Sequence, residues 1–332
     1  MFLPCRSGWR SGRDAGAPAG RRRDPGMKIV LLPVPYHLGQ AGAGVGAAPQ
    51  ALLSAGAADL LRADGHQVDI VEVHRRGPLL DELSAVVEVN AALAAEVRRA
   101  RTARRLPVVL GGDCNVALGV VAGFSGSTVG VVWFDAHGDF NTPESSPSGF
   151  LDGMPLAMAC GLCHRHIWDA LGGEPVAEAH VAHVGSRDLD PDEQRMLAAS
   201  RVGVVSALTL GRQAPADALA PALAAIGGRR GGRLRRPGEN RGIDDVYLHV
   251  DMDVLDPTVA PAVDYPAPGG LEPDELIEAL RAVGERFHIR ALSLTAFDPE
   301  RPDPDGRTLR QALELLQELV AVAASPTPEA AR

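Results

Sequence analysis

A strand that ends in evenly spaced metal-ligand residues is the feature that most constrains this chain. The apolar run at residues 129–134 predicts a buried strand, and Asp135, His137 and Asp139 follow it directly. In extended backbone every second side chain points the same way, so these three would share one face. The segment therefore predicts a strand whose end presents a cluster of potential metal ligands.

The same arrangement occurs at two further places. Residues 246–250 form an apolar run that leads into Asp251 and Asp253, again two positions apart. Residues 106–110 form another, which Cys114 follows in the stretch Gly-Gly-Asp-Cys-Asn. If the ends of these strands converge, they bring together the side chains of a two-metal hydrolase site.

Apolar runs of strand length alternate with segments of helix length along most of the chain. This alternation predicts an α/β fold, with a mainly parallel sheet covered by helices on both faces. Ligands of such folds bind at the carboxyl ends of the strands, where the metal-ligand motifs lie. The expected strands are 28–33, 68–73, 106–110, 129–134, 181–185, 202–206, 246–250 and 289–295, and the expected helices are 47–63, 83–104, 154–162, 190–197, 214–226, 272–285 and 308–324.

Residues 27–324 are predicted to form a single catalytic domain, flanked and interrupted by segments of different composition. Residues 1–26 are rich in Arg, Gly and Pro and lack the apolar core of a signal peptide, so we interpret them as a disordered extension or as sequence upstream of a start at Met27. Residues 227–240 hold five arginines and five glycines, which indicates a surface loop insertion. Residues 325–332 are expected to be a flexible tail.

Composition argues against several classes of partner. The net charge of −9 and the aromatic content of 4% disfavour nucleic acid, which needs basic surfaces and stacking platforms. The chain contains no apolar run of membrane-spanning length, so no membrane partner is expected. Its four cysteines do not resemble a disulfide framework, which favours a reducing, cytoplasmic location.

The ligand candidates have the chemistry of a manganese site. Four carboxylates and one imidazole suit a hard or borderline divalent ion such as Mn²⁺, and two ions about 3.5–4 Å apart can activate a shared water. The alternative is that these are solvated carboxylates after strands, which is harder to reconcile with a motif that repeats. The five residues are Asp135, His137, Asp139, Asp251 and Asp253.

The three motifs, read together, resemble those of the arginase/agmatinase/formimidoylglutamase (ureohydrolase) family. They stand here as GGDCN, DAHGD and HVDMDVLDP, and the loops at residues 44–49 and 266–271 also match that family. The resemblance implies a single-domain, three-layer α/β/α arginase-like fold with two Mn²⁺ ions per subunit. It also implies that Asp135 and Asp251 bridge the ions, and that the protein is a homo-oligomer, a trimer or a hexamer.

Position 114 departs from the family pattern, which has a metal-binding histidine there. Cys114 is interpreted as a metal ligand, since a thiolate can ligate, although it favours Zn²⁺ or Fe²⁺ over Mn²⁺. The alternative is a small buried cysteine that leaves one ion loosely held. Hydrolases of N-hydroxyarginine in cycloserine biosynthesis are similar to this chain at the same position.

The substrate-facing segment matches the family only in part. Asn141, Ser146, Ser148 and Asp190 stand at positions that, by resemblance, hold the polar end of an amino acid, although the serines also suit turns. Asp152 replaces the family's proton-shuttle histidine, and we interpret it as a catalytic acid or base, which requires a raised pKa.

Two further positions bear on the chemistry. Ala296 stands where the family places a glutamate against the guanidinium, so either Asp152, Asp264 or Asp298 takes over that role or the substrate is not arginine. His249 shares a strand face with Asp251 and is interpreted as a second catalytic residue that relays protons, or else as a packed core histidine.

The sequence therefore predicts a dinuclear metal hydrolase of a small guanidino or amidino compound. It would act on a linear C–N bond and release urea or a substituted urea. One alternative is an N-hydroxyarginine hydrolase that gives hydroxyurea and ornithine. The other is a degenerate, non-catalytic member that binds a ligand or regulates a partner.

Overall fold

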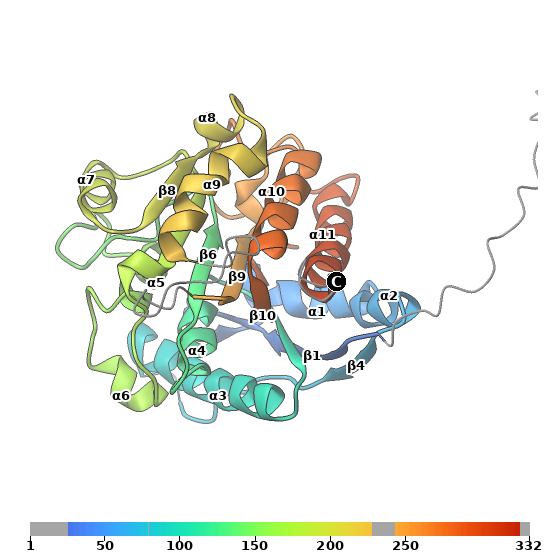
Figure 1. Ribbon diagram of the computed structural model, residues 1–332. Coiled ribbons are helices and arrows are strands. Elements are labelled where there is room, and N and C mark those ends of the chain that lie inside the picture. Colours follow the sequence, from blue (N-terminus) through green and yellow to red (C-terminus); the bar gives the residue numbers. More distant parts are fainter. Residues whose placement is uncertain (1–25, 79, 228–242, 326–332) are drawn as a thin grey trace, which may run out of the picture.

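One large parallel sheet forms the centre of the molecule (Figure 1). The computed structural model describes residues 26–78, 80–227 and 243–325. Within them, eight strands pair in the order β4 (Gln67–Ile70), β1 (Lys28–Val34), β5 (Leu106–Gly111), β10 (His288–Thr295), β9 (Asp245–Asp251), β6 (Gly130–Phe134), β7 (Val181–Ser186) and β8 (Gly203–Ser206). All of these pairs are parallel, and β2 (Tyr36–His37) and β3 (Gln40–Ala41) form a separate short hairpin.

Helices cover both faces of this sheet, as Figure 1 shows. One apolar cluster joins the sheet to α1 (Ala48–Ser54), α2 (Ala57–Ala63), α8 (Ala207–Leu210), α9 (Pro215–Ile226), α10 (Pro273–Arg286) and α11 (Arg307–Ala324). The other joins it to α3 (Glu82–Thr102), α4 (Val116–Ala122), α5 (Pro155–Ala159), α6 (Ile167–Leu171) and α7 (Pro191–Ala199). The expected α/β class and its three-layer form are confirmed.

Local sequence explains where the elements begin and which faces they bury. Asp81 caps α3 by accepting a hydrogen bond from the Ser84 amide at 2.9 Å. Apolar residues then recur along one side of α3, and Arg99 and Arg101 in its last turn suit the helix dipole. Strands β5 and β6 are buried at every residue, as expected for central parallel strands covered on both faces.

Some predicted boundaries are wrong. The helix expected over 47–63 is divided into α1 and α2 at Gly56, whose φ of 94° lies in the left-handed region. The helix expected over 154–162 is only α5, because the chain turns at Gly161 with φ 71°. The extension at 1–26, the insertion at 227–240 and the tail at 325–332 lie almost entirely outside the described residues.

The strand order reverses near the middle of the sheet, and this positions the site. From β6 the chain moves outward through β7 to β8, and it then returns so that β9 and β10 fill the place between β6 and β5. The carboxyl ends of β5, β10, β9 and β6 thus lie side by side. Crevices beside such reversals are where ligands of open parallel sheets bind.

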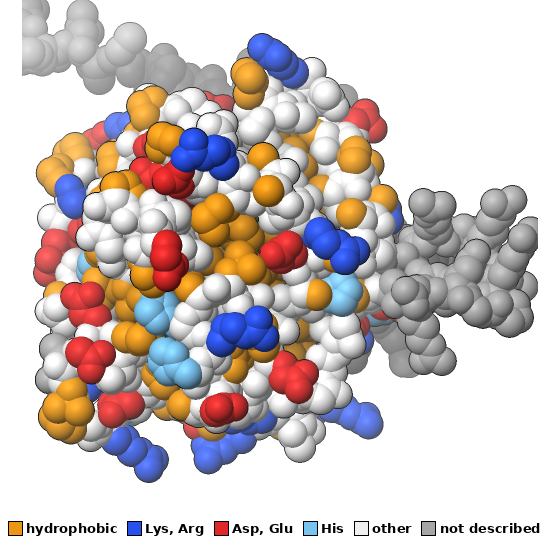
Figure 2. Space-filling view, turned by 90° about the vertical axis from the view of Figure 1, so that its left-hand side faces the viewer, with side chains coloured by type: hydrophobic (Ala, Val, Ile, Leu, Met, Phe, Trp, Pro, Cys, Tyr) orange, Lys and Arg blue, Asp and Glu red, His pale blue; other side chains and the backbone are white. Residues whose placement is uncertain are grey.

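Among the described residues, no helix has the length and apolar character needed to cross a membrane. On the face shown in Figure 2, basic and acidic side chains are interspersed and form no basic patch.

Candidate metal centre and active site

Strand register brings the predicted ligands together. Trp133 of β6 pairs with His249 of β9, and Phe134 pairs with Val250, so Asp135 and Asp251 leave the sheet as neighbours. Thr295 at the end of β10 is the partner of Asp251 on its other side. Because side chains alternate along a strand, this row of polar side chains lies on one face of the sheet.

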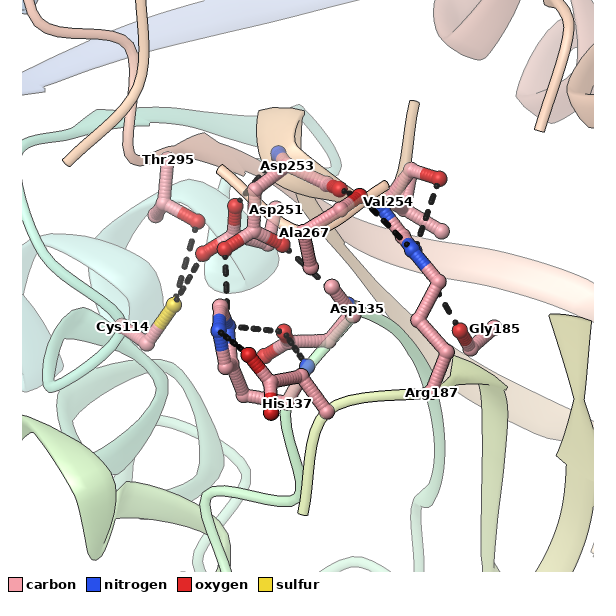
Figure 3. Close-up of polar contacts among 12 residues, drawn as sticks. Cys114, Asp135, His137, Gly185, Arg187, Asp251, Asp253, Val254, Ala267 and Thr295 are labelled. Atoms are coloured by element: carbon pink, nitrogen blue, oxygen red, sulfur yellow. Dashed lines mark hydrogen bonds and ion pairs between the residues drawn. The ribbon is translucent and has the colours of Figure 1, made fainter. Parts of the chain in front are cut away.

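The structure places five of the six candidate ligands in two groups that share a residue, and Asp139 belongs to neither group. Cys114, Asp135 and Asp251 form one group, and Asp135, His137 and Asp253 form the other, with the ligand atoms of each group within 4.8 Å of one another. In Figure 3 these side chains point toward a common centre. Asp135 belongs to both groups, so it is the residue that could contact two ions if both groups held one.

Hydrogen bonds orient the carboxylates of both groups. One oxygen of Asp135 accepts from the His137 amide at 2.7 Å, and the other accepts from the Trp133 indole at 2.9 Å. Asp251 accepts from the Asp253 amide at 2.7 Å. A carboxylate oxygen has more than one lone pair, so these bonds fix each group while leaving it free to ligate.

Asp139 has an acceptor oxygen without a hydrogen bond. Its Oδ2 is buried and has no hydrogen-bond partner among the residues that the structure describes, and its backbone has φ 49°, a left-handed conformation that Asp tolerates. Burial, and then the charge of Asp135, raise the pKa of Asp139 well above its ordinary value. A buried carboxylate oxygen without a hydrogen bond is expected where its natural partner is a metal ion. The donor set therefore fits divalent ions.

The electrostatics of the centre call for positive charge. Burial, and then the charge of Asp253, raise the pKa of Asp251 well above its ordinary value. Burial opposes protonation of His137, but hydrogen bonds to Asp135 and Asp253 raise the pKa of His137 to about 12. Burial, and then the charge of Asp251, raise the pKa of Cys114 well above its ordinary value. Protons thus occupy ligand atoms that a cation would require to be free.

A cavity of about 510 Å³ opens over the two groups. It contains every site residue expected from the sequence except His249, and no Lys or Arg is among its described lining residues. Its wall consists of Val45, Cys114, Asp135, His137, Asp139, Asn141, Ser146, Ser148, Phe150, Asp152, Gly153, Asp188, Asp190, Glu193, Asp251, Asp253, Asp264, Tyr265, Pro266 and Ala296.

The expected substrate contacts lie at the cavity wall and also hold its loops. The Asn141 amide nitrogen donates to Asp190 at 3.0 Å, and Asp190 caps α7. Ser146 accepts from the Gly149 amide at 3.0 Å and Ser148 from the Phe150 amide at 3.2 Å. Both serine side chains therefore stabilise the turn at residues 146–150. Because they also line the cavity, they remain candidates for contact with a substrate.

Asp152 lines the cavity, and a hydrogen bond from Asn115 fixes its carboxyl group. Its Oδ1 accepts from the Asn115 amide nitrogen at 2.9 Å, and it forms a third cluster of potential ligands with His37 and Asp113. Burial, and then the charge of Asp113, raise the pKa of Asp152 well above its ordinary value. The sequence reasoning gave no role to His37, which lies in a two-residue strand without any periodic pattern.

His249 does not reach the cavity. Its ring is fully buried, stacks on Trp133 with centroids 3.7 Å apart, and points its Nε2 at Cys114 Sγ, 3.3 Å away. Burial lowers the pKa of His249 to about 3. Of the candidate ligands it contacts Cys114 directly, and it also stacks on Trp133, whose indole bonds to Asp135.

Ala296 lines the cavity and brings no carboxylate, as expected. Of the three acids considered as substitutes, Asp152 and Asp264 also line the cavity, whereas Asp298 does not. Asp264 is ion-paired with Arg301 at 3.1 Å. Asp152 is therefore the better placed of the three.

Arg187 is a structural residue that the sequence reasoning missed. Its guanidinium donates to the carbonyl oxygens of Asp253 at 2.6 Å and Ala267 at 2.8 Å, as Figure 3 shows. It thereby ties the end of β7 to the loop after β9. Arg187 stands between Ser186 and Asp188, and nothing in this local sequence indicates contacts with backbone carbonyl groups so far along the chain.

Fold and site together define a metal-binding α/β protein of the hydrolase type, and comparison with known proteins makes this specific. The model of the arginase family matches residues 27–321, and the chain belongs to this family. An arginase of Bacillus caldovelox is 32% identical over 284 residues, which cover 82% of this chain and 91% of that protein. An arginase of Bacillus subtilis is 30% identical, covering 88% of this chain and 97% of its own. Among solved structures, an arginase from Bacillus cereus has a TM-score of 0.77 at 31% identity and covers 89% of this chain and 98% of that one.

Proposed function

We propose that this protein is a dinuclear metal hydrolase that cleaves the C–N bond of a linear guanidino or amidino compound and releases urea or a substituted urea. Membership of the arginase family supports the reaction class. The observation that carries the proposal is the place of Asp135 in both ligand groups at the floor of one cavity.

The metal ligands we propose are Cys114, Asp135, His137, Asp139, Asp251 and Asp253, which would hold two Mn²⁺ ions when that ion is supplied. Bound together, two such ions lower the pKa of a water to near neutrality and draw electrons from the reacting carbon. The unsatisfied oxygen of Asp139 and the shared position of Asp135 support this assignment.

Asp152 is the residue we propose to give a proton to the leaving amine. It lines the cavity, and its burial favours the protonated acid that a donor requires. The Asn115 amide nitrogen donates to its Oδ1 at 2.9 Å and so holds the carboxyl group in place at the cavity wall. We propose that His249 affects the reaction through its contact with Cys114 and not by contact with the substrate, because it is buried and does not line the cavity.

The substrate we propose is a small guanidino compound with a polar end that contacts Asn141, Ser146, Ser148 and Asp190. The acidic lining favours a cationic group, and no Lys or Arg among the described lining residues competes with it.

N-hydroxyarginine is the second candidate, because Ala296 offers no carboxylate to a charged guanidinium. N-hydroxyarginine is less basic than arginine and depends less on such a partner. The remaining alternative, a non-catalytic member, is disfavoured by the complete set of ligand side chains at the cavity floor.

A panel assay tests the reaction class. After loading with Mn²⁺, the protein is incubated with arginine, N-hydroxyarginine, agmatine and guanidinobutyrate, and urea or hydroxyurea is measured; formimidoylglutamate is followed by formamide release. Turnover of at least one compound that is lost in Asp135→Ala supports the proposal. Binding of these compounds without any turnover would favour the non-catalytic alternative. The cytoplasmic location and the trimeric or hexameric assembly stay predictions.

A further inference from the structure

The two ligand groups differ in the chemistry of their donors. Cys114, Asp135 and Asp251 offer one sulfur and two carboxylates, whereas Asp135, His137 and Asp253 offer one imidazole and two carboxylates. Thiolate is a soft donor that selects ions such as Zn²⁺ and Fe²⁺, and the imidazole–carboxylate set accommodates Mn²⁺. Two ions bound in this centre would therefore have different sets of donor atoms.

A layer of polar side chains lies directly beneath the ligands on the same face of the sheet. Ser293, His249 and Trp133 are register partners on adjacent strands, each two positions before Thr295, Asp251 and Asp135. Since alternate residues of a strand share a face, Ser293, His249 and Trp133 lie next to the row of residues at the strand ends and can contact the candidate ligands. Trp133 bonds to Asp135 in this way at 2.9 Å, and His249 contacts Cys114 at 3.3 Å.

The hydroxyl groups behind His249 determine which way its bonds run. Its Nδ1 lies 2.8 Å from Ser293 Oγ and 2.9 Å from Tyr247 Oη, and these two oxygens are 2.6 Å apart. A ligating sulfur can only accept a hydrogen bond, so Nε2 must carry the ring proton and donate it to Cys114. Nδ1 is then an acceptor, and either hydroxyl can donate to it.

Burying the polar groups of Tyr247, His249 and Ser293 costs free energy, and a role in positioning the Cys114 sulfur would explain why they are there. Tyr247, His249 and Ser293 are all fully buried in the middle of the sheet, where apolar side chains would pack without polar groups to satisfy. No described cavity-lining residue belongs to this trio, so the trio does not contact the substrate. Cys114 is the candidate ligand that His249 contacts directly, at 3.3 Å, and the same Nε2 has a longer contact with Thr295 Oγ1 at 3.5 Å.

We propose that the Cys114 group binds a softer divalent ion, of the Zn²⁺ or Fe²⁺ class, than the His137 group, and that Tyr247, Ser293 and His249 form a relay that positions the Cys114 sulfur for it. The inference rests on the metal centre of the proposed function and adds the identity and selectivity of its two halves. His249 is a positioning residue in this account. Outer hydrogen-bond partners of metal ligands commonly change metal affinity by about 10–100-fold.

Metal binding in the absence of substrate tests whether the Cys114 and His137 groups prefer different ions. Metal-free protein is prepared without oxygen and loaded with Mn²⁺ alone, then titrated with Zn²⁺ while the Mn²⁺ paramagnetic resonance signal is followed. The expected result is that one equivalent of Zn²⁺ displaces one of two Mn²⁺ ions and converts a spin-coupled signal into that of an isolated ion. Co²⁺ alone should give a sulfur-to-metal charge-transfer band that disappears in Cys114→Ser. Displacement of both Mn²⁺ ions together, or absence of the band, would overturn the proposal.

Variants of the relay test the role of His249. His249→Leu removes the donor and should weaken Zn²⁺ binding at the Cys114 group by about 10–100-fold, with Mn²⁺ binding at the His137 group retained. His249→Gln, which keeps an N–H group, should lose less. Tyr247→Phe or Ser293→Ala alone should have a small effect because the other hydroxyl remains, and the double variant should approach His249→Leu. Equal losses at both metal groups, or no loss in the double variant, would mean that the trio is only a packing element.

Turnover is measured on the same preparations to separate this inference from the proposed function. Selective metal loading without release of urea or hydroxyurea would refute the proposed reaction and leave the two unequal sites standing. Turnover with two ions that Zn²⁺ displaces equally would refute the inference and leave the reaction standing.

Discussion

The Nδ1 atom of His137 lies 2.9 Å from Oδ2 of Asp253, an ion pair that joins the ends of β6 and β9. Both residues belong to the same candidate ligand group. Burial opposes protonation of the imidazole, but hydrogen bonds to Asp135 and Asp253 raise the pKa of His137 to about 12, which favours the charged form in this pair. A cation bound to this group would replace the proton and make the same two side chains its ligands.

Metal loading should release protons. The pKa of about 12 for His137 and the raised pKa of Cys114 mean that both groups hold a proton near pH 7.5 without metal. Ligation requires both to lose it, so loading should release about two protons from them. Calorimetric titration in buffers with different ionisation enthalpies measures this number. Loading without proton release would show that these residues are not ligands.

The shared position of Asp135 has a distinct consequence for its variants. Asp135→Ala removes a ligand from both groups, so metal content should not exceed one ion and activity should be lost. Asp264→Ala is the matched control, since it removes an aspartate of the same cavity wall that belongs to neither group and pairs with Arg301. Elemental analysis after gel filtration gives the comparison, and two retained ions in Asp135→Ala would refute the site.

The role of Asp152 can be separated from its bond to Asn115. Asp152→Asn keeps an oxygen for the Asn115 amide but cannot transfer a proton, so the metal content should stay the same. The expected loss in kcat is about 10²–10⁴-fold, the contribution of a positioned acid or base. Asp152→His restores a titratable group and should recover part of the activity. If Asp152→Asn is fully active, another group protonates the leaving amine.

Ala296 should make ordinary arginine a poor substrate. A hydrogen bond to a charged group contributes roughly 1.5–3 kcal/mol, so Ala296→Glu should raise kcat/KM for arginine about 10- to 100-fold. The left-handed φ of 63° at this position is already adopted by a residue with a Cβ, so the change adds no new backbone constraint. Steady-state kinetics with arginine and N-hydroxyarginine test it. Efficient arginine turnover that the substitution does not improve would indicate that Asp152 or Asp264 already supplies the charge.

Alternation along a strand predicted much of the site, and it also explains the incomplete expectation for His249. The two-residue period fixes the face of a side chain, so the convergence of Asp135, Asp251 and Asp253 could be expected from sequence. The period does not determine how far along the strand a residue lies from the cavity at the strand end. His249 is on the face of Asp251, as expected, but it lies one layer below the cavity, where Cys114 separates it from the open space.

Contacts between distant segments could not be expected from sequence patterns. The hairpin that carries His37 is held where Asp113 Oδ2 accepts from the Leu38 amide at 2.6 Å, a bond across 75 positions of the chain. Arg187 likewise reaches carbonyl groups 66 and 80 positions away. The break at Gly56 was missed because a single glycine within a helical pattern does not by itself indicate a helix end.

Turnover measured against bound metal tests the central claim most directly. Metal-free protein receives Mn²⁺ in stepwise equivalents, the bound metal is quantified, and urea or hydroxyurea release is followed with the best compound of the substrate panel. The account predicts that turnover rises with the second bound equivalent and that Asp135→Ala shows none at any loading. Full turnover without metal, or unchanged turnover in Asp135→Ala, would contradict it.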